Sequence, residues 1–156
     1  MAWTVPKTWS SEPLTSTDMN TYIRDNQNYL KQRLDLSDAY MTKLLNYSTT
    51  ATSWVNVDAT NLRDTITTTG GDVLATLFAY GRHNTGNPWD VRATIDATNV
   101  GHFMRFENAG DYFGVSFAYV FRGVSAGSHT FSLQYQMPSG GTGWMYRPQF
   151  TVRELL

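Results

Sequence analysis

Residues 112–121 read Tyr-Phe-Gly-Val-Ser-Phe-Ala-Tyr-Val-Phe, and every odd-numbered position in this stretch is aromatic or aliphatic. The row consists of Phe113, Val115, Phe117, Tyr119 and Phe121. Successive side chains of a β-strand point to opposite faces, so a period of two predicts a strand with one buried face. The stretch therefore predicts a β-rich fold with an apolar core beneath this row.

Further strands follow from the same period. Residues 89–97 carry Trp89, Val91, Ala93, Ile95 and Ala97 at odd positions, residues 130–137 repeat the alternation, and the last strand holds Phe150, Val152 and Leu155. Residues 73–80 are apolar on both faces, which predicts a central strand covered twice, and 54–57 and 65–68 are shorter candidates. Glycine, proline and asparagine supply turns between them. Seven or eight short strands predict a mainly β domain over residues 54–156, an antiparallel β-sandwich of the jelly-roll kind.

The even positions of residues 112–121 are weakly polar. Tyr112, Ser116, Ala118 and Val120 would face away from the core row, and none of them is charged. A sheet face in contact with water usually carries charge. Either another subunit covers this face or it is a plain neutral exterior.

A helical segment is predicted ahead of the sandwich, over residues 15–47. Thr15 and Asp18 have the spacing of a capping box. The three-to-four spacing of Met19, Ile23, Asn26 and Leu30 indicates one apolar helical stripe, and a second stretch with similar spacing continues to residue 47. Such a stripe can lie on the sandwich or bundle with copies of itself, and a buried asparagine suits a coiled coil because it sets register. Residues 48–53 are predicted to be a linker.

The first 14 residues predict an extended arm, because two prolines and two tryptophans in so short a stretch oppose a helix. Trp3 and Trp9 would be poorly placed in water. They pack either on the protein's own body or on a partner.

The composition excludes several classes of function. Charged residues make up 16% of the chain, the net charge is −1, and there is no cysteine. A nucleic-acid binder would carry a basic patch, and a disulfide framework needs cysteine. The N-terminus lacks the apolar core of a signal peptide, and no apolar run reaches the length of a membrane span. We expect a protein made in the cytoplasm that contacts neither nucleic acid nor the membrane interior.

No pattern of residues predicts catalysis. His83, His102 and His129 are scattered, and no spacing links them as metal ligands. The glycine-rich loop at 139–143 lacks the lysine and the following helix of a phosphate loop. We therefore expect no enzyme activity, metal or cofactor. One possible function without catalysis is that of a carbohydrate-binding, lectin-like module, which we keep as the alternative hypothesis. Trp144 or Trp89 would then stack on the sugar, although the odd-numbered position of Trp89 favours a place in the core.

Two segments resemble known families. Met1-Ala-Trp-Thr-Val-Pro-Lys-Thr-Trp-Ser10, followed by Leu14-Thr-Ser-Thr-Asp-Met-Asn-Thr-Tyr-Ile-Arg-Asp-Asn26, resembles the N-terminus of structural proteins of tailed bacteriophages and prophages. Those proteins share a motif of the form Leu-Thr-x-x-x-x-Asn-x-x-x-Arg-Asp-Asn. Residues 124–136 and 150–155 resemble the last strands of jelly rolls of the tumour-necrosis-factor and complement-head type.

The resemblance implies a trimeric virion protein, either a head or tail fibre or a capsid decoration protein. Residues Trp3, Val5, Pro6 and Trp9 would attach it to other virion proteins, and Met19, Ile23, Asn26 and Leu30 would form the bundle of a homotrimer. Loops at 84–88, 108–111 and 139–143 are candidates for contact with the host surface, where a glycan is the expected partner. The candidate receptor-facing residues are Asn84, Asn87, Asn108, Asp111 and Trp144.

Overall fold

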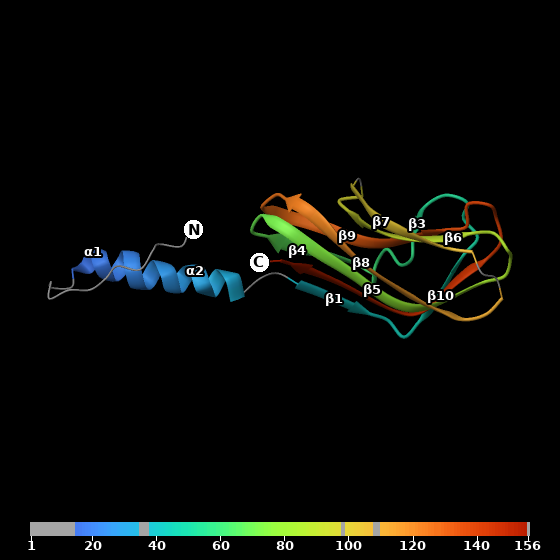
Figure 1. Ribbon diagram of the computed structural model, residues 1–156, viewed down its shortest axis with the longest axis horizontal. Coiled ribbons are helices and arrows are strands. Elements are labelled where there is room, and N and C mark those ends of the chain that lie inside the picture. Colours follow the sequence, from blue (N-terminus) through green and yellow to red (C-terminus); the bar gives the residue numbers. More distant parts are fainter. Residues whose placement is uncertain (1–14, 35–37, 98, 108–109, 156) are drawn as a thin grey trace. The chain divides into compact units, whose positions relative to one another are not determined.

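The computed structural model describes residues 15–34, 38–97, 99–107 and 110–155 (Figure 1). The chain divides into two compact units, Met1–Leu36 and Ser37–Leu156. The arm residues Trp3, Val5, Pro6 and Trp9 and the loop residue Asn108 lie outside the described residues.

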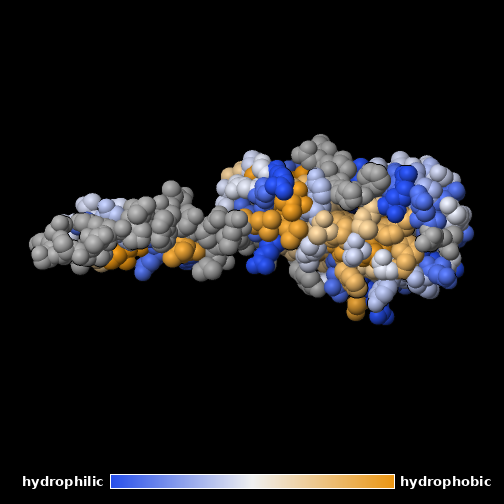
Figure 2. Space-filling view, in the orientation of Figure 1, coloured by the Kyte–Doolittle hydropathy of each residue, from blue (hydrophilic) through white to orange (hydrophobic). Residues whose placement is uncertain are grey.

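The first unit is helical. It contains α1 (Ser16–Asp18), the π-helical turn η1 (Met19–Arg24) and α2 (Asp25–Leu34). The predicted capping box is confirmed, because the Asp18 amide donates to Thr15 Oγ1 at 3.1 Å and the Thr15 amide donates to Asp18 Oδ2 at 3.2 Å. Met19, Ile23 and Leu30 are 46%, 37% and 51% exposed. Figure 2 shows apolar residues along one side of this unit.

The helix ends thirteen residues earlier than the predicted residue 47, and this part of the prediction is wrong. Residues after it form the strands β1 (Asp38–Thr42) and β2 (Asn46–Thr49), so the predicted linker also begins inside a strand. Ala39 and Met41 are buried in the sandwich core, two positions apart. The spacing of Leu36, Ala39-Tyr40 and Lys43-Leu44 in this stretch also fits a helix. Pairing with a strand more than a hundred residues away decides the outcome.

The second unit is an antiparallel β-sandwich of two sheets, stacked face to face in Figure 1. In the first sheet β1 is followed by β10 (Gly143–Glu154), β5 (Gly71–His83) and β8 (Phe113–Val124), and β2 pairs with the other half of β10. In the second sheet β3 (Val55–Asn56) is followed by β9 (Gly127–Gln136), β6 (Trp89–Ile95) and β7 (Asn99–Phe106), and β4 (Arg63–Thr68) pairs with another part of β9.

The strand order is that of a jelly roll. β1 and β2 act as one interrupted strand along β10, and β3 and β4 act as one along β9. Counted this way, the first sheet takes the first, eighth, third and sixth strands, and the second sheet takes the second, seventh, fourth and fifth. This is the arrangement of two Greek keys wrapped into a sandwich. The predicted fold class is confirmed.

Trp89, the first residue of β6, is part of the core and has no exposed surface. Two glycines on neighbouring strands leave room for its indole ring. A Cβ atom at Gly81 would lie 2.5 Å from Trp89 Cζ3, and one at Gly143 would clash with the same ring. Trp89 is therefore a core residue, as its odd position favours, and it offers no platform to a sugar.

Two details of the predicted strands differ from the structure. Phe78 and Tyr80 on β5 are each half exposed, so within this unit β5 is covered on one face only and the prediction of double cover is wrong. On β10 the buried row continues from Phe150 and Val152 to Glu154, rather than to Leu155. Glu154 Oε1 accepts hydrogen bonds from the Thr69 amide and hydroxyl, both at 2.8 Å.

Candidate functional site

The jelly roll has two ends with different connections. The β5–β6, β7–β8 and β9–β10 loops lie at one end, which we call the loop end; its described residues are 84–88, 107, 110–112 and 137–142. At the other end, which we call the base (residues 69–70, 96–97 and 125–126), β1 begins and β10 finishes. The register confirms this, since Asp38 pairs with Arg153 and Glu154 pairs with Val73, at the start of β5. The chain therefore comes into the sandwich at the end opposite the loops.

Backbone contacts bring the three predicted host-facing loops together. The Asn84 amide donates to the Thr142 carbonyl at 3.1 Å, and the Gly110 amide donates to the His83 carbonyl at 2.9 Å. The side chains of Asn84 and Asn87 are engaged between these loops. Asn84 Oδ1 accepts from the Thr142 amide at 2.8 Å, and Asn87 Nδ2 donates to the Ser139 carbonyl at 2.8 Å. The side chains of Asn84 and Asn87 therefore tie the 84–88 loop to the 137–142 loop, whereas Asp111 is exposed to solvent.

Beside these loops, the outer face of the first sheet carries a cluster of aromatic residues. We call it the aromatic platform and define it as Tyr80, Arg82, Tyr112, Trp144 and Tyr146. The register of β5 and β10 places Tyr80 opposite Tyr146 and Arg82 opposite Trp144. Tyr112 comes from the loop before β8, and its ring centroid lies 5.2 Å from that of Tyr146.

The platform borders a cavity of about 330 Å³, lined by Asn46, Tyr80, Tyr112, Tyr146 and Arg147. Burial raises the pKa of Tyr146, and the hydroxyl of Tyr112 raises it further. The phenol of Tyr146 is therefore neutral and protonated in neutral solution. Aromatic faces combined with hydroxyl and amide groups can hold the ring of a saccharide by stacking and hydrogen bonding.

The outer face of the second sheet is polar, and its groups bind one another. Arg92 donates to Gln134 Oε1 from Nε at 2.9 Å and from Nη2 at 2.7 Å, and its guanidinium lies 4.1 Å from the ring centroid of Trp54. The buried carboxylate of Asp90 accepts from Arg105 Nε at 2.9 Å and from Gln136 at 3.0 Å. Because these donors and acceptors are already engaged, this face is the weaker candidate for a ligand.

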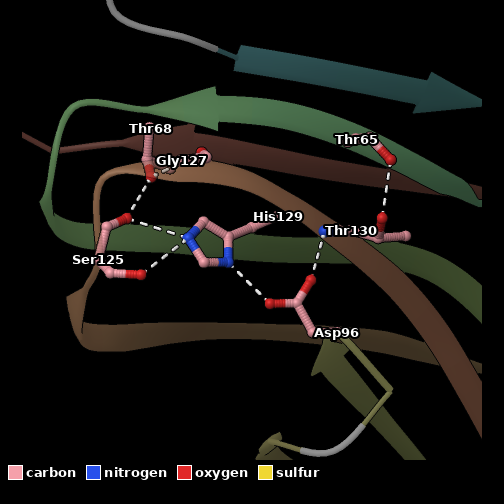
Figure 3. A network of polar contacts seen from close by, with 7 residues as sticks. All are labelled: Thr65, Thr68, Asp96, Ser125, Gly127, His129 and Thr130. Atoms are coloured by element: carbon pink, nitrogen blue, oxygen red, sulfur yellow. Dashed lines mark hydrogen bonds and ion pairs between the residues drawn. The ribbon is translucent and has the colours of Figure 1, made fainter.

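A third cluster at the base combines serine, histidine and aspartate (Figure 3). His129 Nδ1 lies 2.7 Å from Asp96 Oδ2, and His129 Nε2 lies 3.3 Å from Ser125 Oγ. A serine nucleophile requires Nε2 to accept the hydroxyl proton. Here Nε2 lies closer, at 3.0 Å, to the Ser125 carbonyl oxygen, which can only accept. Nε2 therefore carries a proton that it donates to the carbonyl, and the cluster is a structural clamp.

The electrostatics of this clamp agree with that assignment. The hydrogen bond to Asp96 raises the pKa of His129, although burial opposes the shift. Burial would raise the pKa of Asp96, but hydrogen bonds from His129 and from the Thr130 amide outweigh it and lower that pKa. Sequence reasoning missed the clamp because residues 96 and 129 are far apart in the chain. Only the neighbouring positions of the two hairpin turns in a jelly roll could have indicated it.

Within the described ranges, no group of three or more histidine, aspartate or glutamate residues could hold a metal ion. Over the same part of the chain, no helix combines the length and apolarity needed to cross a bilayer.

Comparison with known proteins finds similarity in fold only. No family model matches the sequence, and no curated protein matches it. A carbohydrate-binding domain of a multidomain xylanase, from the hindgut metagenome of Trinervitermes trinervoides, is 10% identical with a TM-score of 0.44, over 77% of this chain and 99% of that one. A carbohydrate-binding module from a Cellvibrio mixtus lichenase, solved with cellotriose, is 13% identical with a TM-score of 0.41, over 81% and 94%.

A phage protein is also among the neighbours. The tripod of the bacteriophage Tuc2009 baseplate is 14% identical with a TM-score of 0.41, over 98% of this chain and 78% of that one. At these identities and TM-scores the likenesses support no argument about function. The fold class rests on the strand order described above.

Proposed function

We propose that this chain is a virion structural protein, a fibre or decoration type of subunit, that projects its jelly roll outward and adheres to a saccharide on the host surface through the aromatic platform. One observation carries the proposal. The platform and the host-facing loops lie at the end of the sandwich opposite the base, where the preceding segment joins it. An adhesion module held by its N-terminus needs its binding surface at the far end.

The N-terminal resemblance to phage structural proteins supports the attachment half of the proposal. Trp3, Val5, Pro6 and Trp9 are the proposed contacts with other virion proteins. Met19, Ile23 and Leu30 are exposed in the helical unit, and we propose that they bundle in a homotrimer. Exposed apolar stripes of this kind are buried when helices associate. Asn26 is the proposed register residue.

Saccharide binding can be tested with the full chain and Trp144→Ala. Isothermal titration against host-surface polysaccharide, or binding to host cells, would measure the affinity. Removing one stacking ring costs roughly 1.4 kcal/mol, which is about a tenfold loss of affinity. Trp54→Ala is the matched control, because Trp54 is a half-buried tryptophan just before β3, packed on Arg92 of the second sheet, and its loss should leave the affinity unchanged. Equal losses in both variants would contradict the role of the platform.

The homotrimer can be tested by measuring the mass in solution. The full chain should have three times the 17.6 kDa mass of one chain at micromolar concentration. Ile23→Asp should yield monomers, because a charge within an apolar bundle is costly. Leu44→Asp is the control, since Leu44 is 77% exposed and lies outside the helical unit. A monomeric parent chain at micromolar concentration would rule out the bundle.

A lectin-like module without any particle is the second candidate, and the aromatic platform is the observation that favours it. It predicts the same effect of Trp144→Ala. The two candidates differ at Trp9→Ala, which should abolish incorporation into particles only if the chain is a virion protein.

A further inference from the structure

We propose that the aromatic platform binds a saccharide that carries a negative charge, as a carboxylate or a phosphate group. This inference rests on the proposed saccharide-binding function and names the class of ligand. It is carried by two arginines at the platform, Arg82 and Arg147, which form no ion pair within the part of the chain that the structure describes.

Arg82 is held in place by rings rather than by a carboxylate. Its Cζ lies 5.7 Å from the ring centroid of Tyr112 and 5.6 Å from that of Trp144. Cation–π contacts of this length orient a guanidinium but leave its positive charge uncompensated. Its Nε is buried and has no hydrogen-bond partner. The charge of Arg82 thus faces the platform in a fixed direction.

Two other arginines of the sandwich have a carboxylate partner. Arg105 Nε lies 2.9 Å from Asp90 Oδ1, and Arg122 Nη1 lies 3.7 Å from Asp72 Oδ2. No ion pair involves Arg82 or Arg147 among the described residues. Asp111 directly precedes Tyr112 and is the acidic residue nearest to the platform in sequence. The two residues before Gly110, asparagine and alanine, are uncharged. The platform therefore carries two cations for which no ion pair is found among the described residues.

Arg147 stands at an irregular point of β10. The pairing of β10 with β5 shifts between Tyr146 and Gln149, and Arg147 adopts a positive φ of 48°. Left-handed backbone is uncommon for a residue other than glycine, and such positions often mark functional sites. The Arg147 amide donates to the Leu45 carbonyl at 3.1 Å, which holds the bulge, and the residue lines the cavity beside Tyr80 and Tyr146.

This combination fits one kind of ligand. Guanidinium groups bind carboxylate and phosphate oxygens through paired, charge-assisted hydrogen bonds. The phenols of Tyr80 and Tyr146 can supply neutral hydrogen bonds, and the face of Trp144 can stack on a sugar ring. A neutral saccharide would use the rings but leave both cations without a partner.

The test compares an acidic saccharide with its neutral form on the full chain. The probes are an oligogalacturonate, its methyl ester and a phosphorylated oligosaccharide, measured by isothermal titration. We expect the acid to bind at least tenfold more tightly than the ester, and raised salt to weaken only the charged probes. The preference between carboxylate and phosphate identifies the source of the charge.

Three variants complete the test. Arg82→Gln should lower the affinity for the acidic probe about tenfold and leave that for the ester unchanged, and Arg147→Gln should do the same to a smaller extent. Arg63→Gln is the control, because Arg63 is an exposed arginine of β4 on the other sheet. Equal affinity for acid and ester, with no salt dependence, would overturn this inference while leaving saccharide binding intact. Failure of the parent chain to bind any probe would overturn both proposals.

Discussion

The base and the loop end of the jelly roll use their polar residues in opposite ways. At the base, Asp96, His129 and Ser125 bind one another, and the Thr68 hydroxyl donates to the Ser125 carbonyl at 2.7 Å (Figure 3). At the loop end, Arg82 faces aromatic rings and has no acidic partner among the described residues. Polar groups that satisfy one another stabilise a fold, whereas an unpaired charge among half-exposed rings is available to a ligand. The two ends therefore differ in whether their charged groups already have partners within the described residues.

The largest expected effect concerns the core beneath the loop end. Gly81→Val should destabilise the fold by about 3 kcal/mol or more, because a Cβ atom there lies 2.5 Å from Trp89 Cζ3 and 2.7 Å from Phe113 Cε2. Gly114→Val is the matched control on the outer face of β8, where a Cβ atom meets nothing within 4 Å. Urea unfolding would measure both. Similar losses in the two variants would mean that Trp89 does not need the space at Gly81.

A smaller loss is expected when the base clamp is broken. Asp96→Ala removes the acceptor of both His129 Nδ1 and the Thr130 amide, which lies 2.8 Å from Asp96 Oδ1. The expected cost is about 1–3 kcal/mol in the free energy of unfolding. At the loop end, Asp111→Ala should cost almost nothing, because Asp111 is exposed. If the two substitutions lowered the free energy of unfolding equally, the base and the loop end would not differ in how they use their aspartates.

The pH dependence of stability should also arise at the base, from the titration of His129 and Asp96. The pKa of His129 is raised, so its contribution is complete below its unfolded pKa of about 6.5 and is lost as pH rises through the folded value. The pKa of Asp96 is lowered, so its contribution is present above its unfolded pKa of about 3.9 and is lost as pH falls through the folded value. Thermal unfolding should show the clamp contributing most between about pH 4 and 6.5.

The variant His129→Gln provides the control for this profile. It removes the titrating ring and should flatten the decline of stability above neutral pH. A parent profile that stays flat from pH 6 to 9 would contradict the assignment of a protonated imidazole to the clamp.

The smallest expected effect concerns the loops themselves. Asn87→Ala removes hydrogen bonds to the Ser139 carbonyl at 2.8 Å and the Gly140 carbonyl at 3.3 Å, and should cost about 1 kcal/mol. Hydrogen exchange should become faster in the β9–β10 loop. Ser139→Ala is the control, because it keeps the carbonyl that Asn87 uses. An equal acceleration in both variants would show that Asn87 does not tie these loops together.

Period-two patterns predicted much of the fold because they reflect local geometry. The strands over 89–97, 112–121 and 130–137 are confirmed as β6, β8 and β9, with their odd-numbered residues turned toward the core. The exception is Ala97, which is exposed in the turn after β6 ends at Ile95. The pattern failed for β1 and β2, whose short stretches also fit a helix. Edge strands of four or five residues contain too few positions to separate a period of two from one of 3.6.

The candidate site could be predicted only in part. Trp144 and the host-facing loops were predicted from sequence, whereas Arg82, Tyr112 and Tyr146 were not. These residues lie on three strands or their ends, as many as 64 positions apart. No spacing rule connects them, because the pairing of β5 with β10 and β8 places them side by side.

By itself, the sequence determined that the chain builds a half-buried sheet, which residues form its core, and that a capped helix precedes it. Each of these depends on side chains within one turn or one strand, where the direction of neighbouring residues is set by the backbone. The tertiary structure alone decided that residues 38–42 and 46–49 are strands, that His129 meets Asp96, and that Arg82 and Arg147 lie at the aromatic platform. Those outcomes depend on strand register between distant segments, which the summed burial and hydrogen bonding of the whole sandwich selects.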